Sequence, residues 1–169
     1  MNRRSGFTLI ELLITIAVMS ILLTLAVVNL RSSQASARDE SRKTDVATIA
    51  QQLEVFYDTG SDTTTNTGEY PYTGLMNSES NVKTTLRDID AGALRSPTTS
   101  ASSSISLIVA STTGVPTLAS LNGGATYIYQ PLDATGALCT TAAQECRTFN
   151  LYYTLENNPV VLTITSKHQ

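Results

Sequence analysis

The longest apolar stretch of the chain runs from Phe7 to Leu30 and contains one charged residue, Glu11. As an α-helix rising ~1.5 Å per residue, it would be roughly 36 Å long, enough to cross a hydrocarbon layer of ~30 Å. Arginines flank the stretch on both sides. The pattern therefore predicts a membrane-spanning helix over residues 7–30.

Beyond this span, the pattern becomes that of a helix with one apolar face. Apolar residues recur at three- and four-residue spacing over residues 46–57, with charged and amide side chains between them. No proline occurs before Pro71, and Thr59-Gly60 supplies a stop signal. One helix is therefore predicted over residues 7–58, and its second half needs a partner for its apolar face.

In the second half of the chain, apolar and polar residues alternate with a period of two, which is typical of strands. A short helix is predicted first, at residues 81–89, with Ser80 as its N-cap. Strands are predicted at residues 105–110, 126–130, 149–155 and 160–165, the last two joined as a hairpin. Each strand has one apolar face, as expected for an antiparallel sheet packed on one side. The predicted fold class is α+β, with the second half of the long helix packed on a small antiparallel sheet.

A specific motif lies where the apolar stretch begins. Two arginines lead into the segment Gly6–Glu11, GFTLIE. This segment resembles the processing site of type IV prepilins and pseudopilins, and the resemblance is close from Arg3 to Leu30. It implies a type IV pilin-like fold, cleavage after Gly6 by a dedicated peptidase on the cytoplasmic side, and methylation of the new N-terminal Phe7.

The resemblance also implies a role for Glu11. Cleavage would create an α-amine at Phe7, and the family pairs this carboxylate with the amine of a neighbouring subunit. A buried carboxylate is tolerated when it is paired, so such a pair would fix the register of incoming subunits. The alternative is that Glu11 lies shallow and reaches the lipid headgroups. The Gly-Phe context favours the assembly role.

Two features of the span support other interpretations. Residues 35–37, Ala-Ser-Ala, offer a conventional signal-peptide cleavage site, but the apolar run is too long and Arg31 separates the two. More basic residues follow the span than precede it, so a simple count favours the opposite orientation. Those that follow are Arg31, Arg38, Arg42 and Lys43. We follow the motif, which requires the N-terminus inside and the head outside the cytoplasm.

Cys139 and Cys146 lie between two predicted strands. In an exported domain this spacing indicates a disulfide that closes a short loop, and the alternative is two free thiols. The chain has one histidine, His168, so a zinc site is not expected.

The sequence carries no motif of an enzyme. It lacks a phosphate-binding glycine loop, a paired-cysteine metal spacing and a nucleophile elbow. Two carboxylate pairs are interpreted as solvated loop residues rather than as acid–base pairs or calcium ligands. They are Asp88 with Asp90, and Asp133 with Glu145. We therefore expect no catalytic activity, no metal and no cofactor.

The formal net charge is −3, and few basic residues are available in the head to bind nucleic acid. They are Lys83, Arg87, Arg95, Arg147 and Lys167. Nucleic acid is therefore not an expected partner. The partners that the resemblance implies are further copies of the chain, membrane lipid, prepilin peptidase, and an inner-membrane platform with its ATPase.

The resulting prediction is a structural subunit of a type IV pilus-like filament. Residues 1–6 would be the leader, 7–58 the helix and 59–169 the head. The chain would start in the inner membrane with its head outside the cytoplasm, and then enter an extracellular or periplasmic filament. Two alternatives stay open: a minor pilin or pseudopilin that primes or binds in a type II secretion or DNA-uptake machine, and a plain membrane-anchored ectodomain.

Overall fold

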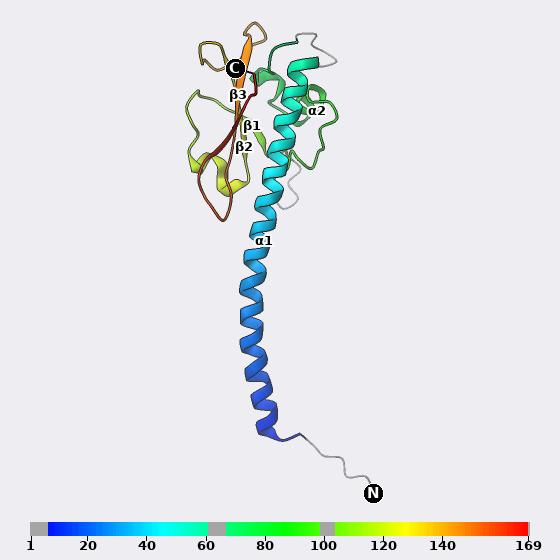
Figure 1. The fold of residues 1–169 in the computed structure, drawn as a ribbon, viewed down its shortest axis with the longest axis vertical. Coiled ribbons are helices and arrows are strands. Elements are labelled where there is room, and N and C mark those ends of the chain that lie inside the picture. Colours follow the sequence, from blue (N-terminus) through cyan, green and yellow to red (C-terminus); the bar gives the residue numbers. More distant parts are fainter. Residues whose placement is uncertain (1–6, 61–66, 99–103, 169) are drawn as a thin grey trace. The chain divides into compact units, whose positions relative to one another are not determined.

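The computed structural model describes residues 7–60, 67–98 and 104–168. The elements follow in the order α1, η1, α2, β1, η2, β2, β3 and β4 (Figure 1). The chain divides into two compact units, Met1–Ala37 and Arg38–Gln169, and the division falls inside α1. The predicted leader, residues 1–6, lies outside the described residues.

Helix α1 runs from Leu9 to Thr59 and contains 51 residues. The prediction of one long helix is confirmed, with both ends within two residues of those expected. Gly60 ends the helix with a φ of 70°, and its amide donates to the carbonyl of Phe56 at 2.7 Å. Glycine favours this left-handed conformation because it has no Cβ.

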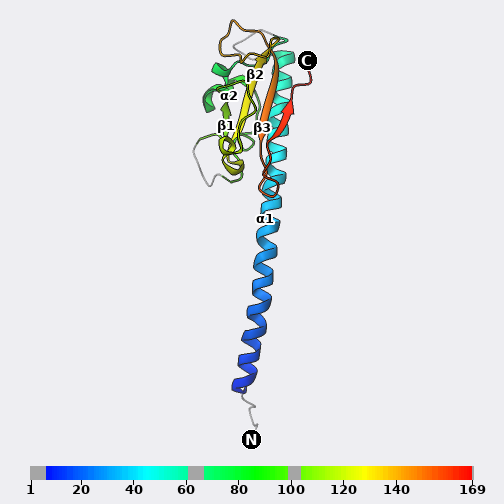
Figure 2. The same ribbon diagram turned by 90° about the vertical axis from the view of Figure 1, so that its left-hand side faces the viewer.

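Within the second unit, the later part of α1 buries one face against the sheet (Figure 2). Its buried residues are Val46, Ile49, Ala50, Leu53 and Phe56. The sheet contributes Leu107, Tyr127, Tyr129, Phe149 and Leu151 to the same core. The predicted apolar face of the helix and the predicted apolar faces of the strands therefore meet in one core.

The sheet has the order β1-β2-β3-β4. The strands are β1 (Leu107–Val109), β2 (Tyr127–Asp133), β3 (Cys146–Tyr153) and β4 (Leu162–Thr165). The pairs β2–β3 and β3–β4 are antiparallel, as predicted, but β1 is parallel to β2, so the sheet is mixed. A parallel pair needs a crossover of a dozen or more residues, and residues 110–126 with η2 (Leu118–Gly124) provide it.

This crossover also covers part of the other face of the sheet. Leu121 of η2 forms a second small core with Ile128 and Tyr152. Beside it, the buried amide of Gln130 donates to two carbonyls of the crossover and accepts from the side chains of Asn150 and Tyr152. A buried amide with its hydrogen bonds satisfied ties the crossover to the sheet.

Two short helices precede the sheet, η1 (Thr73–Leu75) and α2 (Glu79–Thr85). The prediction for α2 is wrong at both ends, because the helix begins and ends earlier than residues 81–89. Its N-cap is Ser78, not Ser80, and the Ser78 hydroxyl accepts an amide of the first turn at 3.2 Å. Val82 of the helix and its C-cap Leu86 are fully buried.

Candidate processing and assembly site

The start of α1 is fixed by Thr8. The amide of Glu11 donates to Thr8 Oγ1 at 3.3 Å, and the amide of Leu12 donates to the Thr8 carbonyl at 3.3 Å. Thr8 is therefore the N-cap of the helix, and its hydroxyl satisfies one of the amides that a helix start leaves free. The predicted cut after Gly6 lies two residues before this cap, at a residue outside the described part of the chain.

Glu11 occupies the third position of the first helical turn. Thr8 and Glu11 have the spacing of a capping box, in which a glutamate follows a capping threonine by three residues. A carboxylate here is also stabilised by the positive end of the helix dipole. This second role of Glu11 was not predicted from the sequence, although Thr8 and Glu11 lie at the start of the apolar stretch. The side chain of Glu11 is exposed, so its carboxylate is free to meet a partner outside its own chain.

The first part of α1 is apolar on all sides and exposed. Its large apolar side chains from Phe7 to Val27 and at Leu30 are between 41% and 83% exposed. By length and composition, α1 is the one described helix that could cross a membrane, and none of its most apolar window is buried. Apolar surface of this extent is unfavourable in water, so lipid or other chains must cover it.

The hydroxyl groups of this segment bond within the helix. Thr15, Ser20 and Thr24 each donate to a carbonyl three or four residues earlier, at 2.7–2.8 Å. These groups therefore need no partner in an apolar environment. Glu11 carries the one charge between Phe7 and Leu30, and no described residue forms an ion pair with its carboxylate.

Residues 1–27 match the family described as the prokaryotic N-terminal methylation motif. This is the signal of type IV pilins and pseudopilins. The pilin signal covers the predicted cut, Phe7 and Glu11, and it implies processing by a prepilin peptidase and filament assembly in general terms. Comparison with curated proteins and with solved structures gives no match. The family of this signal is structural, and the apolar helix followed by a small sheet is a pilin-like fold.

The basic residues that follow the apolar segment are largely paired. Arg42 is fully buried, and its guanidinium donates to Asp39 at 2.7 Å and to Glu156 at 2.5 Å. Arg38 binds Glu156 at 2.7 Å, and Lys43 binds Glu40 at 3.1 Å.

The pKa values of the two carboxylates Asp39 and Glu156 are both lowered. The hydrogen bond from Arg38 lowers the pKa of Glu156 to about 2. Burial opposes ionisation of Asp39, but two backbone amides of the β3–β4 turn and Arg42 lower its pKa overall. Three of the four basic residues counted against the expected orientation are thus neutralised in the folded protein.

The region around the two cysteines is ordered without a bond between them. Cys139 and Cys146 are buried, and burial raises the pKa of both thiols. Cys146 pairs with Asp133 of β2, and the amide of Cys139 donates to the carbonyl of Pro131 of the same strand at 3.0 Å, so both cysteines lie beside β2. Gln144 organises the loop between them by accepting hydrogen bonds from Thr140 and Thr141 and donating to the carbonyl of Leu138. The disulfide stays a prediction.

The remaining candidate residues form no recognisable site. The carboxylate of Asp133 accepts the amides of Thr135 and Ala137 within its own turn, and Glu145 pairs with Arg147. Among the described residues, no group of three or more His, Cys, Asp or Glu could hold a metal ion.

Proposed function

We propose that this chain is the precursor of a structural subunit of a type IV pilus-like filament. It enters the inner membrane through residues 7–30, with the head outside the cytoplasm. Prepilin peptidase cuts it between Gly6 and Phe7, and Phe7 is methylated. The subunit then passes, by way of a platform protein and an ATPase, into a helical filament of identical chains.

The observation that carries this proposal is an exposed apolar helix that begins with one carboxylate. This carboxylate, of Glu11, lies in the first turn of the helix, four residues after Phe7, where cleavage would create a positive amine. At a membrane centre a carboxylate costs ~2.5–3.5 kcal/mol on insertion scales, and somewhat less near an end. An amine from a neighbouring subunit offsets that cost, so Glu11 selects one axial position for each added subunit.

The count of basic residues around the span favours the opposite orientation, so the proposed orientation is based on the motif. Arg38 and Arg42 are held by Asp39 and Glu156 in the folded head. In the folded protein the head therefore presents little excess positive charge after the span. Arginines 3 and 4 belong to the leader, whose expected place is the cytoplasmic side.

Replacement of Glu11 tests this function. We expect Glu11→Ala to insert into the membrane and to be cut after Gly6, but to yield no filaments in material sheared from cells. Glu40→Ala is the matched control, because Glu40 is an exposed helical carboxylate paired with Lys43. The control should assemble normally. Filaments of normal yield from Glu11→Ala would show that Glu11 does not direct assembly.

A further inference from the structure

The sheet of the head has two open edges. In the order β1-β2-β3-β4, each end strand has a hydrogen-bonded neighbour on one side, and no described strand lies on the other. Both end strands are uncharged and contain no proline. Proteins usually protect open edges with charges, prolines or a covering segment, because an open edge offers free backbone groups to another strand. These two strands are therefore suited to further pairing.

On β4, the backbone groups of Thr163 and Thr165 point away from the sheet. The amide of Ser166 donates to the carbonyl of Phe149 on β3 at 3.0 Å, and in this antiparallel register every second residue faces β3. The even-numbered residues of β4 therefore bond to β3, and the odd-numbered residues do not. In the described parts of the chain, no hydrogen bond from another segment reaches the backbone of Thr163 or Thr165.

On β1, the backbone groups of Leu107 and Val109 point away from β2. The amide of Ala110 donates to the carbonyl of Tyr129 at 2.7 Å, and in this parallel register the even-numbered residues bond to β2. Among the described segments, none forms a hydrogen bond with the outward groups of Leu107 and Val109. A hollow of about 480 Å³ between β1 and the start of α2 leaves space beside this edge.

The open side of β4 faces part of α1. A hollow of about 370 Å³ lies there, and its lining includes Ile164 and Thr165 of β4 and Ala47, Ala50 and Gln51 of α1. β4, drawn in red in Figure 2, lies next to this part of α1. Because the alanine side chains are short, a strand added to β4 has space above α1 and would bury one of its faces there.

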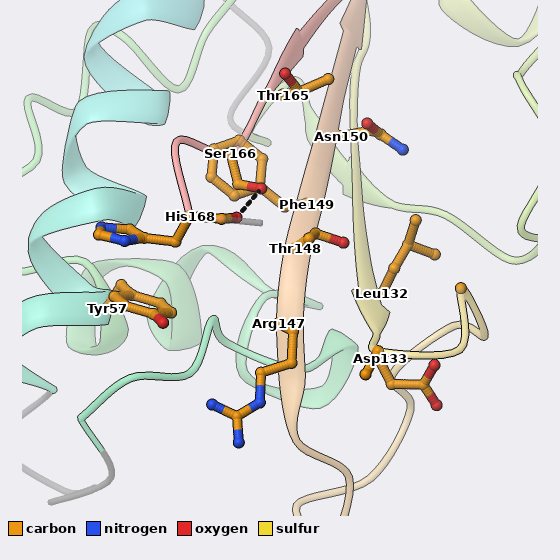
Figure 3. Close-up of a pocket in the computed structure, with 12 residues that line it drawn as sticks. Tyr57, Leu132, Asp133, Arg147, Thr148, Phe149, Asn150, Thr165, Ser166 and His168 are labelled. Atoms are coloured by element: carbon orange, nitrogen blue, oxygen red, sulfur yellow. Dashed lines mark hydrogen bonds between the residues drawn. The ribbon is translucent and has the colours of Figure 1, made fainter.

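The chain that follows β4 leaves this edge open. At Ser166 it departs from β3 and crosses to α1, where the amide of Lys167 donates to Glu54 at 2.9 Å. The ring of His168 then lies flat on Tyr57, with the ring centroids 4.2 Å apart (Figure 3). This end segment is therefore held against α1 and forms no backbone hydrogen bond with the open side of β4.

The two edge strands run in the same direction. β1 is parallel to β2, and both β2 and β4 are antiparallel to β3. In the filament proposed above, neighbouring copies keep the same orientation, because their helices enter it in the same direction. The β1 edge of one head and the β4 edge of the next can then meet as parallel strands. Since this contact joins two different surfaces, it can repeat from copy to copy instead of closing as a dimer.

We propose that β4 of one copy pairs in parallel with β1 of the next copy, so that the sheets of neighbouring heads are continuous. This pairing rests on the proposed filament. The outward groups of Thr163 meet those of Leu107 and Val109 when Thr163 lies opposite Ile108. Both facing side chains are exposed, that of Ile108 by 46%, and the pairing covers them. In the same register Ile164 lies opposite Val109, and both pack against the core of the head.

Disulfide cross-linking of the full chain, in membranes and in sheared surface material, tests this pairing. Paired strands lie ~4.8 Å apart, a distance that a disulfide between facing residues spans. Thr163→Cys combined with Ile108→Cys should give a ladder of covalently linked copies after oxidation. Each single variant should give none, because neither replaced residue faces itself in a neighbouring copy.

A proline on the open side of β4 tests the role of the backbone. Thr165→Pro removes an outward amide but no hydrogen bond to β3, so the head should stay folded, which urea unfolding verifies. Added to the cysteine pair, it should lower the cross-linked fraction about two- to tenfold relative to Thr165→Val, the factor that one hydrogen bond supplies.

Three results would overturn the pairing. They are the absence of a ladder from the cysteine pair in both fractions, equal cross-linking in Thr165→Pro and Thr165→Val, and a ladder from Thr163→Cys alone, which would indicate that β4 pairs with β4. The yield of wild-type filaments tests the proposed function separately. Filaments without a ladder would refute the pairing and leave the proposed function intact. A ladder in membranes without wild-type filaments would support the pairing and contradict the filament.

Discussion

Helix α1 has two regions that handle their apolar surface in different ways. From Leu9 to Val27 and at Leu30 the large apolar side chains are exposed, and the hydroxyl groups of Ser20 and Thr24 donate to carbonyls within the helix. The second region runs from Arg38 to Thr59, and its apolar residues between Val46 and Phe56 lie on one face and are buried by the head. The second region is stabilised by its own chain, whereas the first needs lipid or other copies of the chain.

The polar residues of the two regions differ in the same way. In the second region, Asp39 and Arg42 find their partners in the β3–β4 hairpin of the same chain. In the first, Glu11 has its backbone fixed by Thr8 while its carboxylate is exposed. Among the described residues, none pairs with this carboxylate, which is consistent with the assembly role proposed for it.

The largest expected effect comes from removing the buried arginine of the second region. Arg42→Ala would leave Asp39 and Glu156 without their shared guanidinium and should lower the free energy of unfolding of the head by about 3–5 kcal/mol. Arg31→Ala, at an exposed position of the first region, should leave it unchanged. Urea unfolding of the full chain in detergent, followed through tyrosine fluorescence, measures both. A comparable loss in the two variants would contradict the distinction between the regions.

Matched leucine truncations compare the two regions directly. Leu53→Ala should destabilise the head by about 2–5 kcal/mol, because it leaves a cavity among fully buried residues. Leu22, which is 60% exposed, should tolerate the same change with no effect on the unfolding of the head. Thermal unfolding of both variants gives the comparison. A destabilised head in Leu22→Ala would mean that the first region also packs on the head.

A disulfide would sharpen the contrast by adding a covalent bond to the head, on which the second region of α1 packs. We expect chain recovered from outside the cytoplasm to resist thiol labelling at Cys139 and Cys146, and reduction to lower the free energy of unfolding by about 2 kcal/mol. The effect is modest because the loop is short and Gln144 already orders it. Cys139→Ser with Cys146→Ser should unfold like the reduced protein. Full labelling of native chain would establish the free thiols.

The smallest expected effect is the pH dependence of the stability of the head, because protonation of Asp45 and protonation of Glu156 change the free energy of unfolding in opposite directions. Burial raises the pKa of Asp45 to about 6, so its protonation stabilises the head as the pH falls from about 6 to 4. Glu156, with a pKa of about 2, contributes stability above about pH 4 that is lost as the pH falls towards 2.

The free energy of unfolding, measured across this pH range, should therefore show a maximum in mild acid. Asp45→Asn should remove the rise between about pH 6 and 4, and Glu156→Gln should reduce the loss below it. A stability that is flat with pH in the wild-type chain would contradict both assignments.

The sequence predicted the features that depend on periodicity. The long helix, its apolar face and the inward faces of β3 and β4 follow from spacings of 3.6 and 2, and the structure confirms them. The parallel pairing of β1 could not be predicted in this way, because it depends on the path of residues 110–126. The burial of Arg42 was also missed, because its partner Glu156 is distant in the sequence and no local pattern joins them.

The candidate site was predicted from a short local motif. Gly6, Phe7 and Glu11 lie within six residues, so their spacing alone carries the information. The capping role of Thr8 was equally local and could have been recognised. The position of His168 could not, because it meets Glu54 and Tyr57 only after the sheet has formed.

The most direct test is the N-terminal sequence and intact mass of the protein, recovered from membranes and from sheared surface material. We predict a chain that starts at Phe7 and carries one added methyl group, present in both fractions. The same start confined to membranes would favour a pseudopilin or a minor subunit. A chain that starts at Met1 or at Arg38 would contradict the proposed processing, and with it the role of Glu11 in assembly.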